Sequence, residues 1–266
     1  MDKSLPEKPL PVAPNVAPLP AYTVGGPSIP GFQTRFASLS LHMEDRLRFL
    51  RFPPDVVNTC RQTIVTTWKR GIQGERVYAG SYEFKTMGHP WRGAGDEAME
   101  ARRLVCALLG TLHTMGWVLT LNTDVSKSVR DKDTLLFRHQ IPAPAECEWG
   151  CVAFSKTDRI RFIDLPPEIC GAVASKIDQS WVKEQSIYMQ GVYEIRLHGS
   201  PWYSNGTDTM KVRELLLVLL ETLEEEGWTV YASIDQKNGT ENTTETDTWH
   251  CSKPKGWVKG TPVYHS

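Results

Sequence analysis

The sequence predicts an α+β fold built from two tandem copies of one ββαβαββ module, with antiparallel sheets and the helices packed on one face of each sheet. Three observations lead to this prediction. Short sequence patterns recur once along the chain at a nearly constant spacing. In each copy, strand-like alternation and helix-like periodicity follow one another in the same order. One predicted helix is so apolar that a single sheet cannot cover it.

The repeat rests on a long run of matched residues. Asp45–Phe49 (DRLRF) returns as Asp158–Phe162 (DRIRF) at an offset of 113 residues, and beyond Trp68 the offset is 111. Further matched positions are Gly80 and Gly191, Glu83 and Glu194, Trp91 and Trp202, Arg102 and Arg213, and Gly116 and Gly227. These matches predict an internal duplication, with the first copy at 34–141 and the second at 146–251.

The period of the apolar residues divides each copy into strands and helices. A four-residue period from Val56 to Trp68 predicts a helix that follows Pro53-Pro54. The strands expected in the first copy are 35–42, 45–52, 77–88, 117–123 and 134–138, and the second helix is 96–115. The second copy repeats this order. We interpret 77–88 as one long strand because its apolar and polar residues alternate.

The second helix of the second copy is the one too apolar for a single sheet. Leu215 to Leu220 is a run of six apolar residues, and such a helix is buried on most sides. One sheet covers only one side, so we expect this helix to pack against the first copy as well. The two copies would then be related by a pseudo-two-fold axis, as in an internal homodimer.

Two flanking segments lie outside the copies. Residues 1–33 are rich in proline, which fixes φ and removes a backbone donor, so we expect an extended, disordered arm. Pro11 and Pro14 form a minimal PxxP motif that suits an SH3-like groove, although a passive tail has the same composition. Residues 252–266 are expected to form a C-terminal tail.

Charge is distributed unequally between the copies. Residues 35–140 contain 16 Lys and Arg against 11 Asp and Glu, a net charge of +5. Residues 146–251 contain 9 against 18, a net charge of −9. This asymmetry is typical of copies that attract each other, or of a copy that faces a charged partner. Two independently solvated surfaces are the alternative.

The cysteines indicate a reducing environment and no metal site. Cys147 and Cys151 form a C-x3-C pair, but no second pair follows at zinc spacing, so no metal and no cofactor is predicted. The chain starts with a proline-rich stretch rather than an apolar signal segment, and no apolar run approaches the length of a membrane span. We expect a cytoplasmic or nuclear protein that is not secreted and has no membrane contact.

Several charged residues occur in both copies and are candidates for a ligand site. Arg46 and Arg48 must share a sheet face because side chains alternate along a strand. An arginine pair suits a carboxylate or phosphate group, and Glu83 is the accompanying acid. The candidate ligand-binding residues are Arg46, Arg48, Glu83, Arg159, Arg161 and Glu194. Salt bridges that serve only the fold are the alternative interpretation.

A G-x-P-W turn occurs once in each copy and ends in Trp91 or Trp202. Each tryptophan either anchors the helix that follows or contacts a partner protein, since tryptophan is common at the energetic centres of interfaces. Trp91 and Trp202 are therefore candidate partner contacts, together with Pro11 and Pro14.

The sequence favours a non-catalytic protein-binding or scaffold protein. It has no nucleophile elbow, phosphate-binding loop, dinucleotide-binding glycine motif or HExxH motif, and no basic run with interleaved aromatics that would indicate nucleic acid. The alternative is a small-ligand-binding protein or an enzyme with a polar cleft that recognises an anion. A scaffold should keep its arginines in mutual salt bridges, whereas a ligand-binding protein should leave an arginine unpaired in a concavity.

Overall fold

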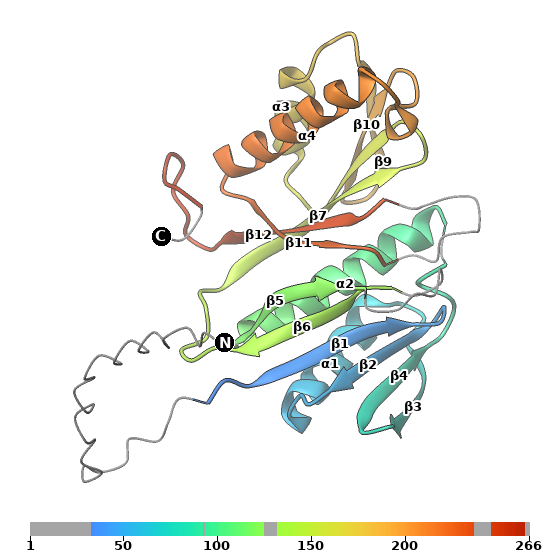
Figure 1. The fold of residues 1–266 in the computed structure, drawn as a ribbon, viewed down its shortest axis with the longest axis vertical. Helices are drawn as coiled ribbons and strands as arrows, with labels where there is room; N and C mark the ends of the chain where they lie inside the picture. The colour runs from blue at the N-terminus through green and yellow to red at the C-terminus, as the bar shows by residue number, and fades with distance from the viewer. Residues whose placement is uncertain (1–32, 93, 125–131, 237–245, 264–266) are drawn as a thin grey trace, which may run out of the picture. The chain divides into compact units, whose positions relative to one another are not determined.

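The computed structural model describes residues 33–92, 94–124, 132–236 and 246–263. They form two six-stranded antiparallel sheets, each accompanied by two α-helices (Figure 1). We call the first sheet, with its helices, module 1 and the second module 2. The α+β class and the tandem duplication are therefore confirmed.

Module 1 contains six strands and two helices. Its elements are β1 (Phe36–His42), β2 (Arg46–Leu50), α1 (Pro54–Thr67), β3 (Ile72–Tyr78), β4 (Ser81–Thr86), α2 (Asp96–Thr114), β5 (Trp117–Thr123) and β6 (Thr134–His139). The strands lie in the order β3-β4-β2-β1-β6-β5 and form sheet A. Alternate residues such as Leu39 and Leu47 point to α1 and α2 and form the core with them. Both helices thus cover one face of sheet A, as expected.

The stretch expected to be one long strand is a hairpin. Ala79 and Gly80 both have positive φ, 46° and 80°, and they turn the chain between β3 and β4. Two-residue hairpin turns need this backbone conformation, which glycine adopts without strain. Each module therefore has the order ββαββαββ, with six strands rather than the five expected. The sequence concealed the turn because β3 lacks a regular alternation and its last two residues adjoin the alternating residues of β4.

Module 2 repeats the arrangement. Its elements are β7 (Cys147–Ser155), β8 (Arg159–Ile163), α3 (Pro167–Lys176), β9 (Val182–Met189), β10 (Val192–Leu197), the 3-10 turn η1 (Pro201–Tyr203), α4 (Asp208–Glu225), β11 (Thr229–Ile234) and β12 (Thr248–Pro254). The order β11-β12-β7-β8-β10-β9 forms sheet B. The register of β7 on β8 matches that of β1 on β2, so the positions of β7 and β8 have equivalents in β1 and β2 at the offset of 113. The last strand runs to Pro254, beyond the predicted boundary at residue 251.

Helix α2 joins the two modules because it packs on both sheets, and residues 34–266 form a single unit (Figure 1). Leu104 and Leu108 face the core of module 1. Ala98 and Met99, near the start of the helix, instead pack against β7, β8 and β10 of sheet B. The helix buried on most sides is thus α2, not the predicted α4.

The modules follow one another head to tail, which corrects the expected pseudo-two-fold relation. A two-fold axis would place α4 on sheet A just as α2 lies on sheet B. In α4, however, Met210 is 63% exposed and Leu217 is 53% exposed. The six-residue apolar run circles the helix, so Leu215 and Leu219 reach the core while Leu217 faces outwards. The length of this apolar run does not indicate which side of α4 is covered by other elements.

No helix in the part of the chain that the structure describes is long and apolar enough to cross a membrane.

Candidate functional site

The predicted arginines of module 1 converge on one carboxylate, on the face of sheet A that lies opposite its helices. Arg46 Nη1 donates to Glu83 Oε1 at 2.5 Å and Arg48 Nε donates to Oε2 at 2.7 Å. Arg76 Nε donates to Oε1 at 2.7 Å. The guanidinium of Arg48 also lies 4.1 Å from the ring centre of Tyr78. We call these residues the first arginine cluster and this side of sheet A its open face.

Glu83 is held ionised by the arginines around it. Its burial would raise the pKa, but hydrogen bonds from Arg48, Arg76 and Arg46 outweigh this effect and lower the pKa of Glu83 to about 2. Only 1% of the residue is exposed, because the arginine side chains lie over it. The carboxylate therefore serves as the shared partner of three cations.

Module 2 contains the equivalent cluster. Arg159 Nη1 and Arg161 Nε donate to the two oxygens of Glu194, each at 2.7 Å. The Arg161 guanidinium lies 3.8 Å from the ring centre of Tyr188. The third arginine is missing, since Ser186 lies opposite Glu194 where Arg76 lies opposite Glu83. The second cluster is thus less basic than the first.

The two clusters differ most in what covers them. The side chain of Arg161 is 4% exposed, whereas that of Arg48 is 20% exposed. Helix α2 accounts for the difference, because Met99 Sδ lies 4.0 Å from Arg161 Nη1. The same sheet face is therefore covered by a helix in module 2 and open in module 1.

All six predicted ligand-binding residues fall into these two clusters, three in each. The period-two argument placed Arg46 and Arg48 on one face, and the register places Glu83 directly opposite Arg48. Sequence reasoning missed Arg76 and Tyr78 because Arg76 precedes the predicted strand 77–88 and Tyr78 was placed on the same strand as Glu83, whereas both belong to β3. Every arginine of the two clusters donates a hydrogen bond to a glutamate.

The two tryptophans of the G-x-P-W turns have different surroundings. Trp91 is fully buried, and its indole nitrogen donates to the carbonyl of Arg46 at 3.1 Å. It anchors the turn to β2, so the prediction that it contacts a partner is corrected. Trp202 is only partly buried and packs edge-on against Phe154. The predicted contacts Pro11 and Pro14 lie outside the described residues.

An open cleft lies between α4 and sheet B of the same module. It has a volume of about 450 Å³ and is lined by Trp202, Arg213 and Trp249 among others. In module 1 the equivalent of Arg213 is Arg102, which is 3% exposed and donates to Thr248 Oγ1 at 3.0 Å. The cleft is a different feature from that contact, because its lining residues Phe154 and Trp249 belong to the core of module 2, on the helix side of sheet B.

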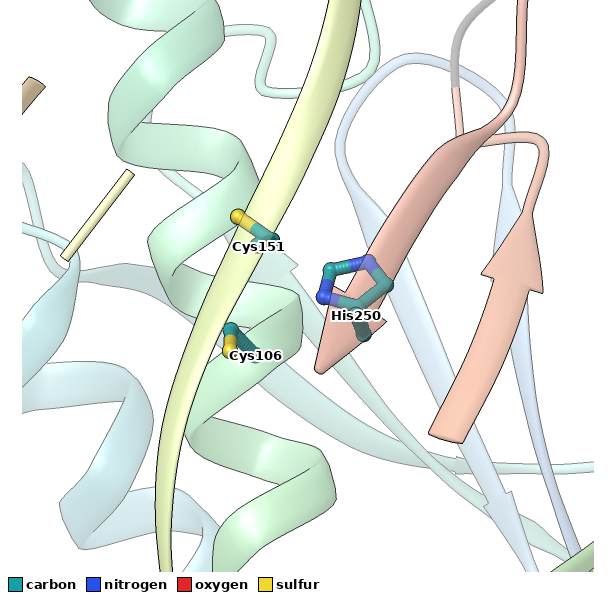
Figure 2. A group of neighbouring side chains, drawn as sticks. All are labelled: Cys106, Cys151 and His250. Carbon is teal, nitrogen blue, oxygen red and sulfur yellow. The ribbon is translucent and has the colours of Figure 1, made fainter. Parts of the chain in front are cut away.

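A second group of polar side chains is buried where α2 meets sheet B. Cys106 comes from α2, Cys151 from β7 and His250 from β12 (Figure 2). Their ligand atoms all lie within 4.8 Å of one another. Burial, with a smaller effect of Arg102, lowers the pKa of His250 to about 3, so the imidazole is neutral. No local spacing in the sequence relates these residues, which come together only in the tertiary structure.

The family comparison agrees with the duplication. A protein-family model described only as a domain matches the chain twice, over residues 35–138 and 148–252. Searches of curated proteins and of solved structures return no match. The two matches cover both modules and more than half of the chain. The chain therefore belongs to this domain family and contains two tandem copies of its domain.

Proposed function

We propose that this chain is a non-catalytic scaffold protein whose open face of sheet A binds a helix, and that the helix is α4 of a second copy. The observation that carries the proposal is the internal contact: the equivalent face of sheet B is covered by α2. A contact of this kind joins two different surfaces, so it can repeat from copy to copy without closing. The two surfaces left over at the ends are α4 and the open face.

The first support is an ion pair inside the chain whose acidic and basic residues are exchanged at the equivalent positions of α4 and the open face. Inside the chain, Arg103 Nε and Nη2 donate to the two carboxylate oxygens of Asp164, each at 2.8 Å. The position equivalent to Arg103 in α4 is Glu214, at the offset of 111, and the position equivalent to Asp164 is Arg51, at 113. Both are exposed. A helix docked as α2 is docked would bring Glu214 to Arg51 and form the same ion pair with the charges exchanged.

The second support is apolar. Cys106 and His250 meet at the internal contact, and their equivalents are Leu217 and Leu136. Ala232, buried beside His250, has Leu121 as its equivalent, and Leu121 is 53% exposed. Docking would bury these three leucines together, which stabilises the contact by removing apolar area from water.

The third support lies near the end of α4. Gly110 of α2 packs against the ring of Trp149. The equivalent residues are Glu221 and Phe36, and Phe36 lies beside Arg138 on the open face. A docked Glu221 would reach the Arg138 guanidinium, so a close steric contact is exchanged for an ion pair. The overall charges, +5 for residues 35–140 and −9 for 146–251, act in the same direction.

The alternative function, an anionic small ligand at Arg46 and Arg48, has weaker support. Glu83 already accepts a hydrogen bond from each of the three guanidinium groups of the first cluster. A ligand carboxylate or phosphate would have to bind beside this negative charge, which opposes an anion. A cytoplasmic or nuclear location is part of the proposal, because all six cysteines are free thiols.

The test exchanges the charges of one ion pair. Arg51→Glu places two acids opposite each other at every contact between copies, and Glu214→Arg places two bases there. Each variant alone should remain a 30.0 kDa monomer at concentrations where the unaltered chain forms larger species. An equimolar mixture of the two variants should assemble again, because the acid introduced in one variant then meets the base introduced in the other. Sedimentation velocity over a concentration series measures the mass.

Two exposed residues away from both surfaces supply the controls. Lys156→Glu and Glu168→Arg change the net charge by the same amounts and should leave assembly unaltered. An unaltered chain that stays monomeric up to millimolar concentration overturns the proposal. So does assembly that both single variants retain.

A further inference from the structure

Three potential metal ligands meet inside the protein at the contact between the modules. Figure 2 shows Cys106 on α2, Cys151 on β7 and His250 on β12. Their exposed fractions are 5%, 1% and 0%. Cys147, the other cysteine of the C-x3-C pair, is not part of this group.

His250 is the unusual member of the group. Neither of its ring nitrogens has a hydrogen-bond partner among the described residues, although both are fully buried. A buried polar group without a partner destabilises a fold, and native structures rarely contain one. A metal ion bound to one of these nitrogens would remove the share of the penalty that belongs to that nitrogen.

The shared fold does not require polar side chains at these positions. The equivalents of Cys106, Cys151 and His250 are Leu217, Ser38 and Leu136. Module 1 and α4 thus form the same backbone with none of the three ligands. The cysteines and the histidine occur together only where α2 lies on sheet B.

We propose that Cys106, Cys151 and His250 bind one Zn²⁺ ion that ties α2 of module 1 to β7 and β12 of module 2. Thiolate sulfur and imidazole nitrogen are the ligands that zinc prefers in proteins. Two thiolates and a neutral imidazole around a dication leave no net charge, which is the arrangement that a buried site tolerates best. This inference does not depend on the proposed assembly.

The geometry accommodates the ion after a small contraction. A point between three atoms that are at most 4.8 Å apart lies no farther from each than 4.8 Å divided by the square root of three, about 2.8 Å. Zinc–sulfur bonds are about 2.3 Å and zinc–nitrogen bonds about 2.0–2.1 Å, so each ligand moves inwards by less than about 1 Å. The carbonyl oxygen of Gly150 lies 3.4 Å from Cys106 Sγ, so an oxygen atom is also close to the three ligands.

Binding has a defined proton balance. Zinc binds cysteine as the thiolate and histidine as the neutral imidazole, so binding displaces the proton of each thiol and transfers no electron. A hydrogen bond with Cys151 and burial raise the pKa of Cys106. Affinity should rise with pH for this reason.

The test uses Co²⁺ as a coloured probe for the zinc site. The full chain, kept reduced and freed of metal with a chelator, is titrated with Co²⁺ and then with Zn²⁺. We expect thiolate-to-cobalt charge-transfer absorption that saturates at one ion per chain and that zinc abolishes. The thermal unfolding midpoint should rise with either ion.

Matched variants locate the site. Cys151→Ser and His250→Leu introduce the residues that module 1 carries, and each should weaken Co²⁺ binding more than about 100-fold, since even outer-shell partners of a metal are worth about 10–100-fold. Cys60→Ala and Cys170→Ala remove buried thiols from the two module cores and should leave binding unaltered. Circular dichroism verifies that each variant folds.

Two results overturn the proposal. One is a reduced, folded, unaltered chain that shows no charge-transfer absorption with Co²⁺ and retains no zinc. The other is undiminished binding in both Cys151→Ser and His250→Leu, which would place any metal elsewhere. The first result needs no variant, so it stands even if a substitution prevents folding.

Discussion

Single carboxylates organise the polar face of each sheet. Glu83 and Glu194 occupy equivalent positions and each accepts hydrogen bonds from the arginines of its own cluster. Their surroundings differ, because the second cluster lies under α2 and the first does not. Removing one partner of a buried ion pair costs more than removing a solvated one, since the remaining charge is left without compensation.

The same substitution in the two clusters should therefore have unequal effects. Glu83→Gln should lower the free energy of unfolding by about 1–3 kcal/mol, because water can reach its partly exposed arginines. Glu194→Gln should lower it by about 3–5 kcal/mol, because Arg161 stays buried beneath Met99. Urea denaturation at neutral pH measures both values. Equal losses would contradict the role assigned to α2 as a cover.

Helices α2 and α4 show how one element serves two environments. Helix α2 follows β4 and helix α4 follows the equivalent strand β10, and each packs on its own sheet through leucine side chains. Helix α2 is also buried on its second side, where Gly110 permits the close approach of Trp149. Helix α4 has Glu221 at that position and is exposed there. Glycine at this position is therefore required by the contact between the modules and not by the helix.

Two glycines inside helices allow a matched experiment. Alanine at Gly171 of α3 meets nothing within 4 Å, so Gly171→Ala should raise the free energy of unfolding by about 0.5–1 kcal/mol through helix propensity. Alanine at Gly110 brings its Cβ to 3.0 Å from the Trp149 ring. Gly110→Ala should thus lower the free energy of unfolding by about 1–3 kcal/mol. Thermal unfolding of both variants gives the comparison, and a stabilised Gly110→Ala protein would contradict the close packing.

For the molecule as a whole, the contact between modules should respond to acid. His250 is buried there as a neutral group, and burial is the main cause that lowers its pKa from 6.5 to about 3. A group with a depressed pKa binds more protons when unfolded. Its contribution to stability is complete above about pH 6.5 and is lost as the pH falls towards 3. Burial lowers the pKa of His113 as well, in the same sense.

The measurement is the free energy of unfolding between neutral pH and about pH 5, in the presence of a chelator. The unaltered chain should lose up to about 1.4 kcal/mol per pH unit from His250 alone. His250→Leu should show a shallower dependence and no loss of stability at neutral pH. Equal slopes for the two proteins would mean that another group controls the acid response.

Features that depend on near neighbours could be predicted from the residues alone. Alternation and matched spacing predicted the α+β class, the duplication, most of the strands and the common face of Arg46 and Arg48. The same residues left open whether the arginines would bind a ligand or pair with Glu83 and Glu194, because the register of the facing strands decides which residues meet. The turn at Ala79-Gly80 was missed, since β3 (Ile72–Tyr78) has no regular alternation of apolar and polar residues and its last two residues were assigned to the strand that follows.

Which surfaces cover one another depended on the packing of the complete chain. The apolar run of α4 predicted that this helix would be buried on most sides. The helix buried in this way is instead α2, whose Gly110 and Cys106 pack closely on sheet B. The meeting of Cys106, Cys151 and His250 depends on the same contact and leaves no spacing in the sequence. Local periodicity fixes the direction in which a side chain points, whereas the partner it meets depends on how two distant surfaces pack, and that is a property of the whole fold.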